Sequence, residues 1–306
     1  MRKYHFQLEV YATKALTALM LLSGLWVWSS CKDDDGLDAG DPNYFTSSRG
    51  QFTATQDDGT TLFLLPGSTS GSATLTYDGS NPRHWQSETN ANVNVTTYQG
   101  DLTLSETLTA NGQRYTLTAI GSEALMGCRS LTSVVLPATI KSLGEGAFAI
   151  CTTLTAVNIP EGVTDIPTGC FGYCQKLTTM VLPSTVKTLG AMAFFGCSGL
   201  TAMTLPEGLT SIGERCFFDC SKLTEITIPS TVKTIGSRCF GGRSATDRSK
   251  IAVYHMLSST PPTLEGVLYE AQEGVTPVIK VPAGAVAAYQ AAAGWSTLTI
   301  EEEDAQ

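Results

Sequence analysis

Leu177-Thr-Thr-Met-Val-Leu-Pro183-Ser-Thr-Val-Lys-Thr-Leu-Gly190-Ala-Met-Ala-Phe-Phe-Gly-Cys197, completed by Ser198-Gly199, is one copy of a 23-residue unit that occurs five times in succession without an insertion. Each unit opens on a leucine: Leu131, Leu154, Leu177, Leu200 and Leu223. A proline follows six residues later: Pro137, Pro160, Pro183, Pro206 and Pro229. A cysteine closes each preceding unit: Cys128, Cys151, Cys174, Cys197 and Cys220. A strict period of roughly 20 to 50 residues is typical of a solenoid, in which each unit is one coil packed between its neighbours.

Within the unit, the apolar pattern predicts a short strand followed by a corner. Residues Met180 to Leu182 alternate inward, outward and inward, as in a half-buried strand. Pro183 then ends the strand, because proline has no N–H to donate to a ladder. We expect a column of glycines to turn the chain at the next corner, with Pro167 in its place in the second unit. These glycines are Gly144, Gly190, Gly213 and Gly236.

The order Leu-x-x-Val/Ile-x-Ile/Leu-Pro-x-x-Val-x-x-Ile/Leu-Gly-x-x-Ala/Cys-Phe-x-x-Cys resembles the leucine-rich repeat of the BspA-like surface lipoproteins of the Bacteroides group. The resemblance covers about Thr116 to Phe240, with a degenerate half-unit at Ile120–Cys128. It implies a repeat solenoid of 23-residue coils with short parallel strands. Because the family is grouped by its coil, the resemblance names no ligand.

Different patterns flank the repeats and predict two caps. Before the repeats, alternating Thr-rich runs and the turn signal Asn111-Gly112 predict a small antiparallel β cap. After Phe240 the period fails, and a strand followed by a short helix that stops near Gly294 predicts an α+β cap. The expected divisions are a signal peptide (1–30), an acidic linker (31–49), the N-terminal β cap (50–115), the solenoid (116–245), the C-terminal cap (246–300) and an acidic tail (301–306).

The first residues predict export and lipidation. Basic residues precede the apolar stretch Ala15 to Trp28, which is shorter than a comfortable membrane span. Trp28-Ser29-Ser30-Cys31 resembles a bacterial lipobox, with Trp28 where leucine is usual, and implies acylation of Cys31. The following Lys32-Asp-Asp-Asp-Gly36 resembles an acidic export tag to the exterior of the outer membrane, and is also compatible with a solvated linker. We therefore expect an outer-membrane, lipid-anchored protein facing the cell exterior.

Net charge argues against nucleic acid as a partner. The whole chain carries a formal charge of −9. Removing residues 1–30 takes away three of its 19 basic side chains and one of its 28 acidic ones, which leaves a charge near −11. Phosphate binding needs clustered Lys and Arg, which the sequence lacks.

The cysteines occupy repeat columns, which favours buried thiols over a disulfide framework. In a solenoid, side chains of one column stack about 4.8 Å apart, and buried free cysteine behaves as a small hydrophobe. A disulfide stays open where Cys170, Cys216 and Cys239 meet a neighbour. Cys170/Cys174 and Cys216/Cys220 have a zinc-compatible spacing, but no second ligand pair accompanies them, so we expect no metal.

No catalytic constellation is evident. The mature chain has two histidines, His84 and His255, and neither lies near a recognisable nucleophile motif. Phosphate-binding glycine loops and calcium loops are also missing, so we expect neither a cofactor nor an enzyme.

Two candidate binding surfaces remain. One is the outward strand positions, which are small and mostly hydroxyl-bearing: Ser133, Val135, Ala156, Asn158, Thr179, Val181, Ala202, Thr204, Glu225 and Thr227. The other is an aromatic cluster of the N-terminal cap, Tyr77, His84 and Trp85, for which a role in the cap core is the alternative. Lys and Glu also alternate between odd and even coils, as at Lys187 and Glu161, which predicts a mixed-charge stripe with weak cross-coil pairs. The resemblance implies an adhesin-like protein that binds an extracellular protein or glycan. The alternative is a structural or accessory component of a surface assembly.

Overall fold

A computed structural model describes residues 51–77, 98–242, 250–269 and 276–303. Contacts divide the chain into two units, and all the described residues belong to the unit formed by Ser47–Asn81 and Val93–Gln306. The predicted signal peptide, the acidic linker and the lipidation site at Cys31 lie outside the described residues.

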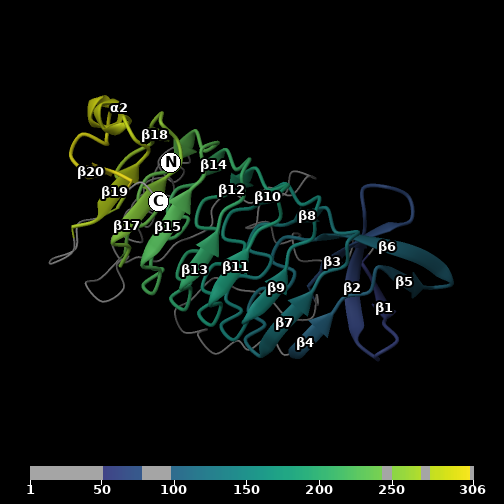
Figure 1. Cartoon of the computed structure of the whole chain (residues 1–306). Helices are drawn as coiled ribbons and strands as arrows, with labels where there is room; N and C mark the ends of the chain where they lie inside the picture. The colour runs from purple at the N-terminus through teal and green to yellow at the C-terminus, as the bar shows by residue number, and fades with distance from the viewer. Residues whose placement is uncertain (1–50, 78–97, 243–249, 270–275, 304–306) are drawn as a thin grey trace, which may run out of the picture. The chain divides into compact units, whose positions relative to one another are not determined.

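Each coil of the repeat contributes two short strands, stacked as parallel ladders (Figure 1). The first strands of the coils are β7 (Leu131–Val135), β9 (Ala156–Asn158), β11 (Thr179–Val181), β13 (Ala202–Thr204) and β15 (Glu225–Ile228). The second strands are β8 (Ser142–Leu143), β10 (Asp165–Ile166), β12 (Thr188–Leu189), β14 (Ser211–Ile212) and β16 (Thr234–Ile235). The register steps by one repeat, so that Met180 lies opposite Met203. The predicted repeat solenoid with short parallel strands is confirmed.

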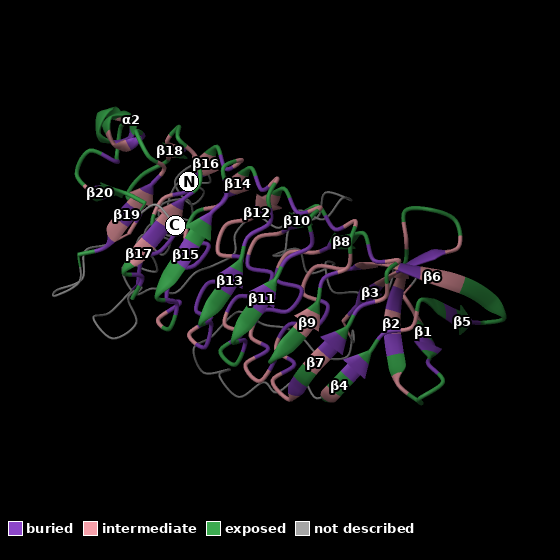
Figure 2. Cartoon of the chain, viewed as in Figure 1, coloured by how far each residue is buried: buried purple, intermediate pink, exposed green. Residues whose placement is uncertain are grey.

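The first strand of the coil has the predicted alternation of buried and exposed side chains (Figure 2). Met180 and Leu182 are buried, whereas the side chain of Val181 between them is 71% exposed. The other coils repeat this pattern, except that Val157 of β9 and Ser133 of β7 are half-buried, so the outward positions form one continuous face.

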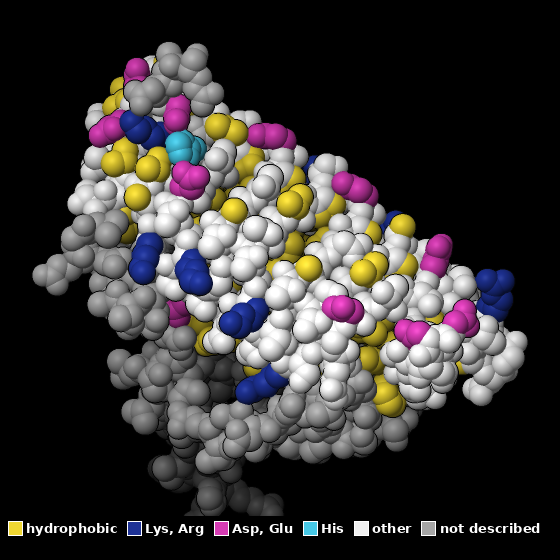
Figure 3. Space-filling view, turned by 60° about the horizontal axis from the view of Figure 1, so that its bottom comes forward, with side chains coloured by type: hydrophobic (Ala, Val, Ile, Leu, Met, Phe, Trp, Pro, Cys, Tyr) yellow, Lys and Arg dark blue, Asp and Glu magenta, His cyan; other side chains and the backbone are white. Residues whose placement is uncertain are grey.

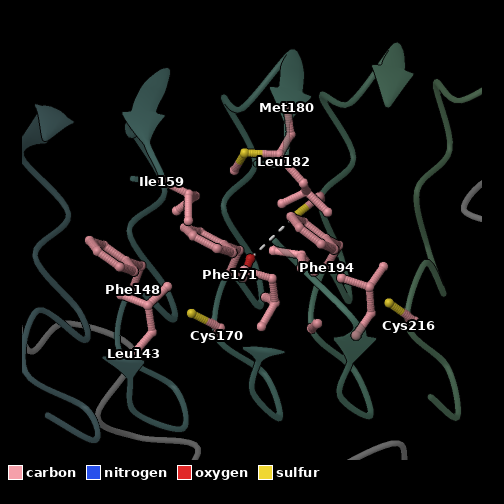
Figure 4. Close-up of a cluster of buried hydrophobic side chains, with 14 of the residues drawn as sticks. Leu143, Phe148, Ile159, Cys170, Phe171, Met180, Leu182, Phe194 and Cys216 are labelled. Atoms are coloured by element: carbon pink, nitrogen blue, oxygen red, sulfur yellow. Dashed lines mark hydrogen bonds between the residues drawn. The ribbon is translucent and has the colours of Figure 1, made fainter. Parts of the chain in front are cut away.

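A ladder of phenylalanines fills the interior of the coils (Figure 4). The buried rings of Phe148, Phe171, Phe194, Phe217 and Phe240 stack with centroids 5.1 to 5.5 Å apart. The ring planes lie within 10° of parallel. Each ring is covered only when both neighbouring coils are present, so the ladder couples the stability of adjacent coils.

The glycine column has a different physical basis from the expected corner turn. Gly144, Gly190, Gly213 and Gly236 do not have positive φ angles. Instead, the column packs against the backbone of the preceding coil, and a Cβ at Gly190 or Gly213 would lie 2.5 Å from a backbone nitrogen of that coil. The amide of Gly213 also donates a 2.8 Å hydrogen bond to the carbonyl oxygen of Leu189. Glycine is needed in this column because two backbones approach closely.

The left-handed corners of the coil lie in two other columns. One contains Glu123, Gly146, Gly169, Met192, Arg215 and Arg238, and the other contains Gly127, Ile150, Tyr173, Gly196 and Asp219; their φ angles run from 53° to 74°. Residues other than glycine pay a steric cost in this region, most of all a β-branched one such as Ile150. Backbone hydrogen bonds between coils hold the conformation, as from the amide of Ile150 to the carbonyl oxygen of Gly172 at 2.7 Å.

The N-terminal cap is a five-strand array in the order β1-β2-β3-β6-β5. Its strands are β1 (Phe52–Thr55), β2 (Thr61–Pro66), β3 (Ser72–Thr76), β5 (Thr107–Ala110) and β6 (Gln113–Ile120). The predicted hairpin turn at Asn111-Gly112 is confirmed, with both residues at positive φ. One pair departs from the expected antiparallel arrangement, because β3 and β6 are parallel. The end of β6 also pairs with β8, and β4 (Gly100–Thr103) pairs with β7, so the cap merges directly into the coils.

The C-terminal cap extends the sheet of first strands. It consists of β17 (Val253–Met256), β18 (Thr263–Leu264), β19 (Val278–Val281), α2 (Val286–Ala291) and β20 (Thr299–Glu302). Strands β15, β17, β19 and β20 are parallel neighbours, although the spacing between them in the sequence is irregular. The chain therefore continues to coil after the sequence period has failed.

In this cap, part of the predicted acidic tail is a strand, and the predicted helix is present. Glu301 and Glu302, assigned to an acidic tail, instead belong to β20, where the carboxylate of Glu301 pairs with Lys280 at 3.0 Å. The predicted helix is α2, which ends at Ala291, and Gly294 follows with a φ of 81°. Buried Trp295 packs edge-on against Tyr289 and donates from Nε1 to the carbonyl oxygen of Pro262 at 2.8 Å.

Candidate binding surface

Nine strands lie side by side and present one outward face (Figure 1): the five first strands of the coils, β4 before them, and β17, β19 and β20 after them. At about 4.8 Å per strand this face is roughly 40 Å long. Nine of the ten sequence-predicted positions are exposed and Ser133 is half-buried. The structure thus brings all ten onto one face, whatever that face binds.

The outward side chains form two parallel rows. Register pairs Ser133 with Ala156 in one row, and Val135 with Asn158 in the other. The same two rows contain Thr179 beside Ala202, and Val181 beside Thr204. The central coils therefore offer an uncharged surface of hydroxyl and small apolar groups. In Figure 3 most of the visible side of the molecule has the colour of uncharged polar side chains and backbone, with separate charged and hydrophobic side chains scattered over it.

Two of the ten positions have structural hydrogen bonds. The side-chain oxygen of Asn158 accepts from the amide of Leu136 at 2.7 Å, and its nitrogen donates to the Leu136 carbonyl oxygen at 3.0 Å. The hydroxyl of Ser133 donates to a carboxylate oxygen of Asp101 at 2.6 Å, as Thr132 does at 2.7 Å. These bonds lower the pKa of Asp101 below its ordinary value, and the bond from Ser133 has the larger effect. Asn158 and Ser133 therefore hold neighbouring strands together.

The C-terminal end of the face is charged, which the sequence analysis missed. Thr227 lies opposite His255, and His255 lies opposite Lys280. The Nδ1 atom of His255 lies 3.0 Å from a carboxylate oxygen of Glu303. The repeat register fails before this segment, so the sequence alone could not align His255 and Lys280 with the outward rows.

Many of the threonines at the edges of the coils have a structural role, because their hydroxyls hydrogen-bond to the backbone of the preceding coil. Thr155 donates to the carbonyl oxygen of Thr132 at 2.9 Å, and Thr201 donates to that of Thr178 at 3.0 Å. Each bond joins a coil to the preceding one. The threonines of this column stabilise the stack and are a poor guide to a binding site.

Two of the alternating residues, Lys141 and Glu161, hydrogen-bond to uncharged groups in place of the expected cross-coil ion pairs. Lys141 donates from Nζ to the carbonyl oxygen of Ala138 at 3.0 Å. Glu161 accepts from the hydroxyl of Ser184 on the next coil at 3.1 Å. Among the residues that the structure describes, no salt bridge joins Lys141, Lys187 or Lys233 to Glu161 or Glu207.

The aromatic cluster predicted in the N-terminal cap is only partly described. Tyr77 is half-buried at the end of the described segment, and its carbonyl oxygen accepts from Nε2 of Gln51 at 2.8 Å. His84 and Trp85 lie outside the described residues. The cluster therefore stays a prediction.

The eight cysteines that the structure describes are buried, and none of them forms a disulfide. Several donate to a backbone carbonyl of the preceding coil, as from Sγ of Cys197 to Phe171 at 3.1 Å, the dashed bond in Figure 4. Burial raises the pKa of Cys197 to about 12 and that of Cys174 well above its ordinary value. Such thiols are poor nucleophiles and poor metal ligands.

Two features are absent from the described ranges. No group of three or more His, Cys, Asp or Glu side chains in them is arranged to hold a metal ion. Nor does any helix there combine the length and apolar character needed to cross a bilayer.

The repeat matches a family model over residues 118–246, in six copies, described as a BspA type leucine-rich repeat region. Residues 118–246 are a BspA-type leucine-rich repeat region. The leucine-rich repeat region covers the coils from the end of β6 through β16, and the two caps lie outside it. No curated protein sequence matches the chain.

Solved bacterial leucine-rich repeat proteins have similar structures. A leucine-rich repeat protein of T. pallidum is 22% identical in sequence and has a TM-score of 0.51. The alignment covers 72% of this chain and 86% of the T. pallidum chain. A leucine-rich cell surface protein of Faecalibacterium prausnitzii is 22% identical with a TM-score of 0.49, and the alignment covers 77% of this chain and 65% of that protein. A leucine-rich repeat protein of Bacteroides ovatus is 18% identical with a TM-score of 0.45, and the alignment covers 79% of this chain and 74% of that protein. The likeness to the T. pallidum protein supports the fold.

Proposed function

We propose that this chain is an exported, lipid-anchored surface protein whose outward strand face binds an extracellular macromolecule, without catalysis. The observation that carries the proposal is the outward face of the leucine-rich repeat region. Its central coils leave Thr179, Val181, Ala202 and Thr204 exposed in two rows. A solenoid otherwise buries its repeated side chains in packing, so exposed rows over many coils suit an extended partner.

The nature of the face favours a neutral, extended partner over a compact charged one. The outward positions of its central coils lack the Trp, Tyr and Arg side chains that dominate compact interface hot spots. Many weak contacts over a length of roughly 40 Å can replace a few strong ones. An extracellular protein or a glycan strand meets this description.

The proposed location rests on the first residues of the sequence. Cys31 follows a short apolar stretch in a lipobox-like context, and acidic residues follow it. Acyl chains on Cys31 would hold the protein at a membrane, because each buried methylene contributes about 0.8 kcal/mol. Fractionation of cells that express Cys31→Ala tests this: we expect the variant in the soluble fraction, and persistence in the membrane fraction would contradict the anchor.

Binding is tested by surface plasmon resonance with the Cys31→Ala protein against immobilised extracellular matrix proteins and glycans. We expect saturable binding to at least one of them at micromolar concentration. A panel that gives no signal would overturn the proposed binding function. Stoichiometric co-purification with an envelope protein, together with no binding to any member of the panel, would favour the structural role in a surface assembly.

A further inference from the structure

The N-terminal cap contains a recess between two hairpin ends, separate from the outward strand face. Its volume is about 480 Å³, within the usual range for small-ligand sites. One wall is the loop between β2 and β3, at residues 67–71, and the other is the β5–β6 turn with Asn111 and Gln113. Phe52 of β1 and Tyr115 of β6 also line it.

The two aromatic side chains supply a partly apolar surface. The rings of Phe52 and Tyr115 lie with centroids 4.6 Å apart and planes at 35°, and both side chains are half-buried. An aromatic ring has an electron-rich face. Electron-poor C–H groups, such as those on one face of a pyranose ring, pack favourably against such a face.

The loop wall is held rigid by the buried hydroxyl of Ser72. This hydroxyl donates to the carbonyl oxygen of Thr69 at 2.7 Å and accepts from the amide of Thr69 at 3.2 Å. The amide of Gly67 donates to the carbonyl oxygen of Ser72 at 2.9 Å, and a Cβ at Gly67 would collide with the Ser72 hydroxyl. A loop fixed in this way loses little conformational entropy when a ligand binds.

The polar groups of the recess are neutral. Ser68, Ser70, Asn111 and Gln113 are exposed and offer hydroxyl and amide groups, which both donate and accept hydrogen bonds. None of the described side chains that line the recess carries a charge. An anionic or cationic ligand would therefore find no counter-charge, whereas a polyhydroxylated neutral ligand matches every lining group.

We propose that this recess binds a neutral saccharide unit, with one sugar face against Phe52 and Tyr115 and its hydroxyls bonded to the amide and hydroxyl groups of the two hairpin ends. A peptide fits less well, because the side chains that anchor protein interfaces occupy well-packed, desolvated pockets, whereas the polar residues of this recess are exposed. The inference goes beyond the proposed strand-face function, and variants in the recess and on the strand face separate the two.

The test uses the Cys31→Ala protein on an array of neutral oligosaccharides built from hexoses, N-acetylhexosamines and fucose. Sialylated and sulfated counterparts and uncharged peptides are printed on the same surface. The strongest neutral oligosaccharide is then titrated in solution by calorimetry. We expect selective binding to the neutral glycans. The proposal would be overturned by no binding to the neutral glycans, by preference for the charged glycans, or by selective binding of the peptides.

Variants locate the binding. Ser70→Trp fills the recess from an exposed loop position, and Thr61→Trp is the matched control at the far, exposed end of β2. We expect Ser70→Trp to raise the Kd at least tenfold and Thr61→Trp to leave it within twofold. Tyr115→Ala should weaken binding similarly, while Tyr115→Phe, which keeps the ring, should not. Unchanged affinity in both Ser70→Trp and Tyr115→Ala would overturn the site.

Discussion

At the scale of single residues, the columns of the repeat are explained by contacts between successive coils. Cysteine thiols donate to carbonyls of the preceding coil, as Cys174 does to Phe148 at 3.2 Å. Gly213 lies against the backbone of Ala191. A repeated residue type here marks a repeated contact, and it carries information about packing rather than about a ligand.

The glycine column gives the first prediction. Gly213→Ala places a Cβ 2.5 Å from a backbone nitrogen, a clash with an atom that cannot rotate away. We expect it to lower the free energy of unfolding by about 2 to 3 kcal/mol. Gly59→Ala is the control, because Gly59 has a φ of 86° but open space around it, and should cost about 1 kcal/mol. Urea unfolding compares them, and equal losses would contradict the close-approach explanation.

The buried thiols give a prediction on pH. Burial raises the pKa of Cys197 from 9.0 to about 12, while the unfolded chain keeps the ordinary value. Stability is therefore complete below pH 9 and falls as the pH rises, because only the unfolded state releases the proton. Above about pH 10 each such thiol steepens the fall by about 1.4 kcal/mol per pH unit. Urea unfolding of Cys197→Ala from pH 7 to 11 should give a shallower slope, and an unchanged slope would contradict a buried, protonated thiol.

At the scale of elements, the C-terminal cap closes the stack. Tyr254 of β17 packs edge-on against Phe240, the last ring of the phenylalanine ladder, with centroids 5.2 Å apart. Beyond it, β19, α2 and β20 cover the open end around Trp295 and Tyr289, both fully buried. An uncovered end of a solenoid exposes apolar side chains and backbone donors to other chains.

Removing the centre of this cap should destabilise it selectively. Trp295→Ala deletes a fully buried ring and its 2.8 Å bond to Pro262. We expect a loss of about 3 to 5 kcal/mol and faster amide hydrogen exchange in β17, β19 and β20 than in β11 and β13. Gln290→Ala, at an exposed position of α2, is the matched control and should change neither. Uniform exchange over all coils in Trp295→Ala would contradict a separate closing role.

At the scale of the whole molecule, the sequence predicted what the 23-residue period repeats and missed what lies outside it. The strands, the outward rows and the buried thiols follow from the period, because each position meets its own copy in the next coil. The left-handed columns escaped prediction, since residues such as Ile150 and Met192 occupy them instead of glycine. The charged end at His255 and Lys280 and the recess at Phe52 and Tyr115 also escaped, because irregular spacing hides which strands become neighbours.

We propose the outward strand face of the leucine-rich repeat region as the surface that binds the extracellular partner, and charged substitutions on this face test the proposal. Val181→Arg with Thr204→Arg places two long charged side chains on neighbouring positions of that face. Ser142→Arg with Thr164→Arg is the matched control, at exposed positions in β8 and directly before β10.

The decisive measurement is the Kd of both double variants for a partner found in the binding screen. We expect Val181→Arg/Thr204→Arg to bind at least tenfold more weakly than the parent protein, while the control stays within twofold. Unchanged affinity in Val181→Arg/Thr204→Arg, or an equal loss in the control, would contradict it.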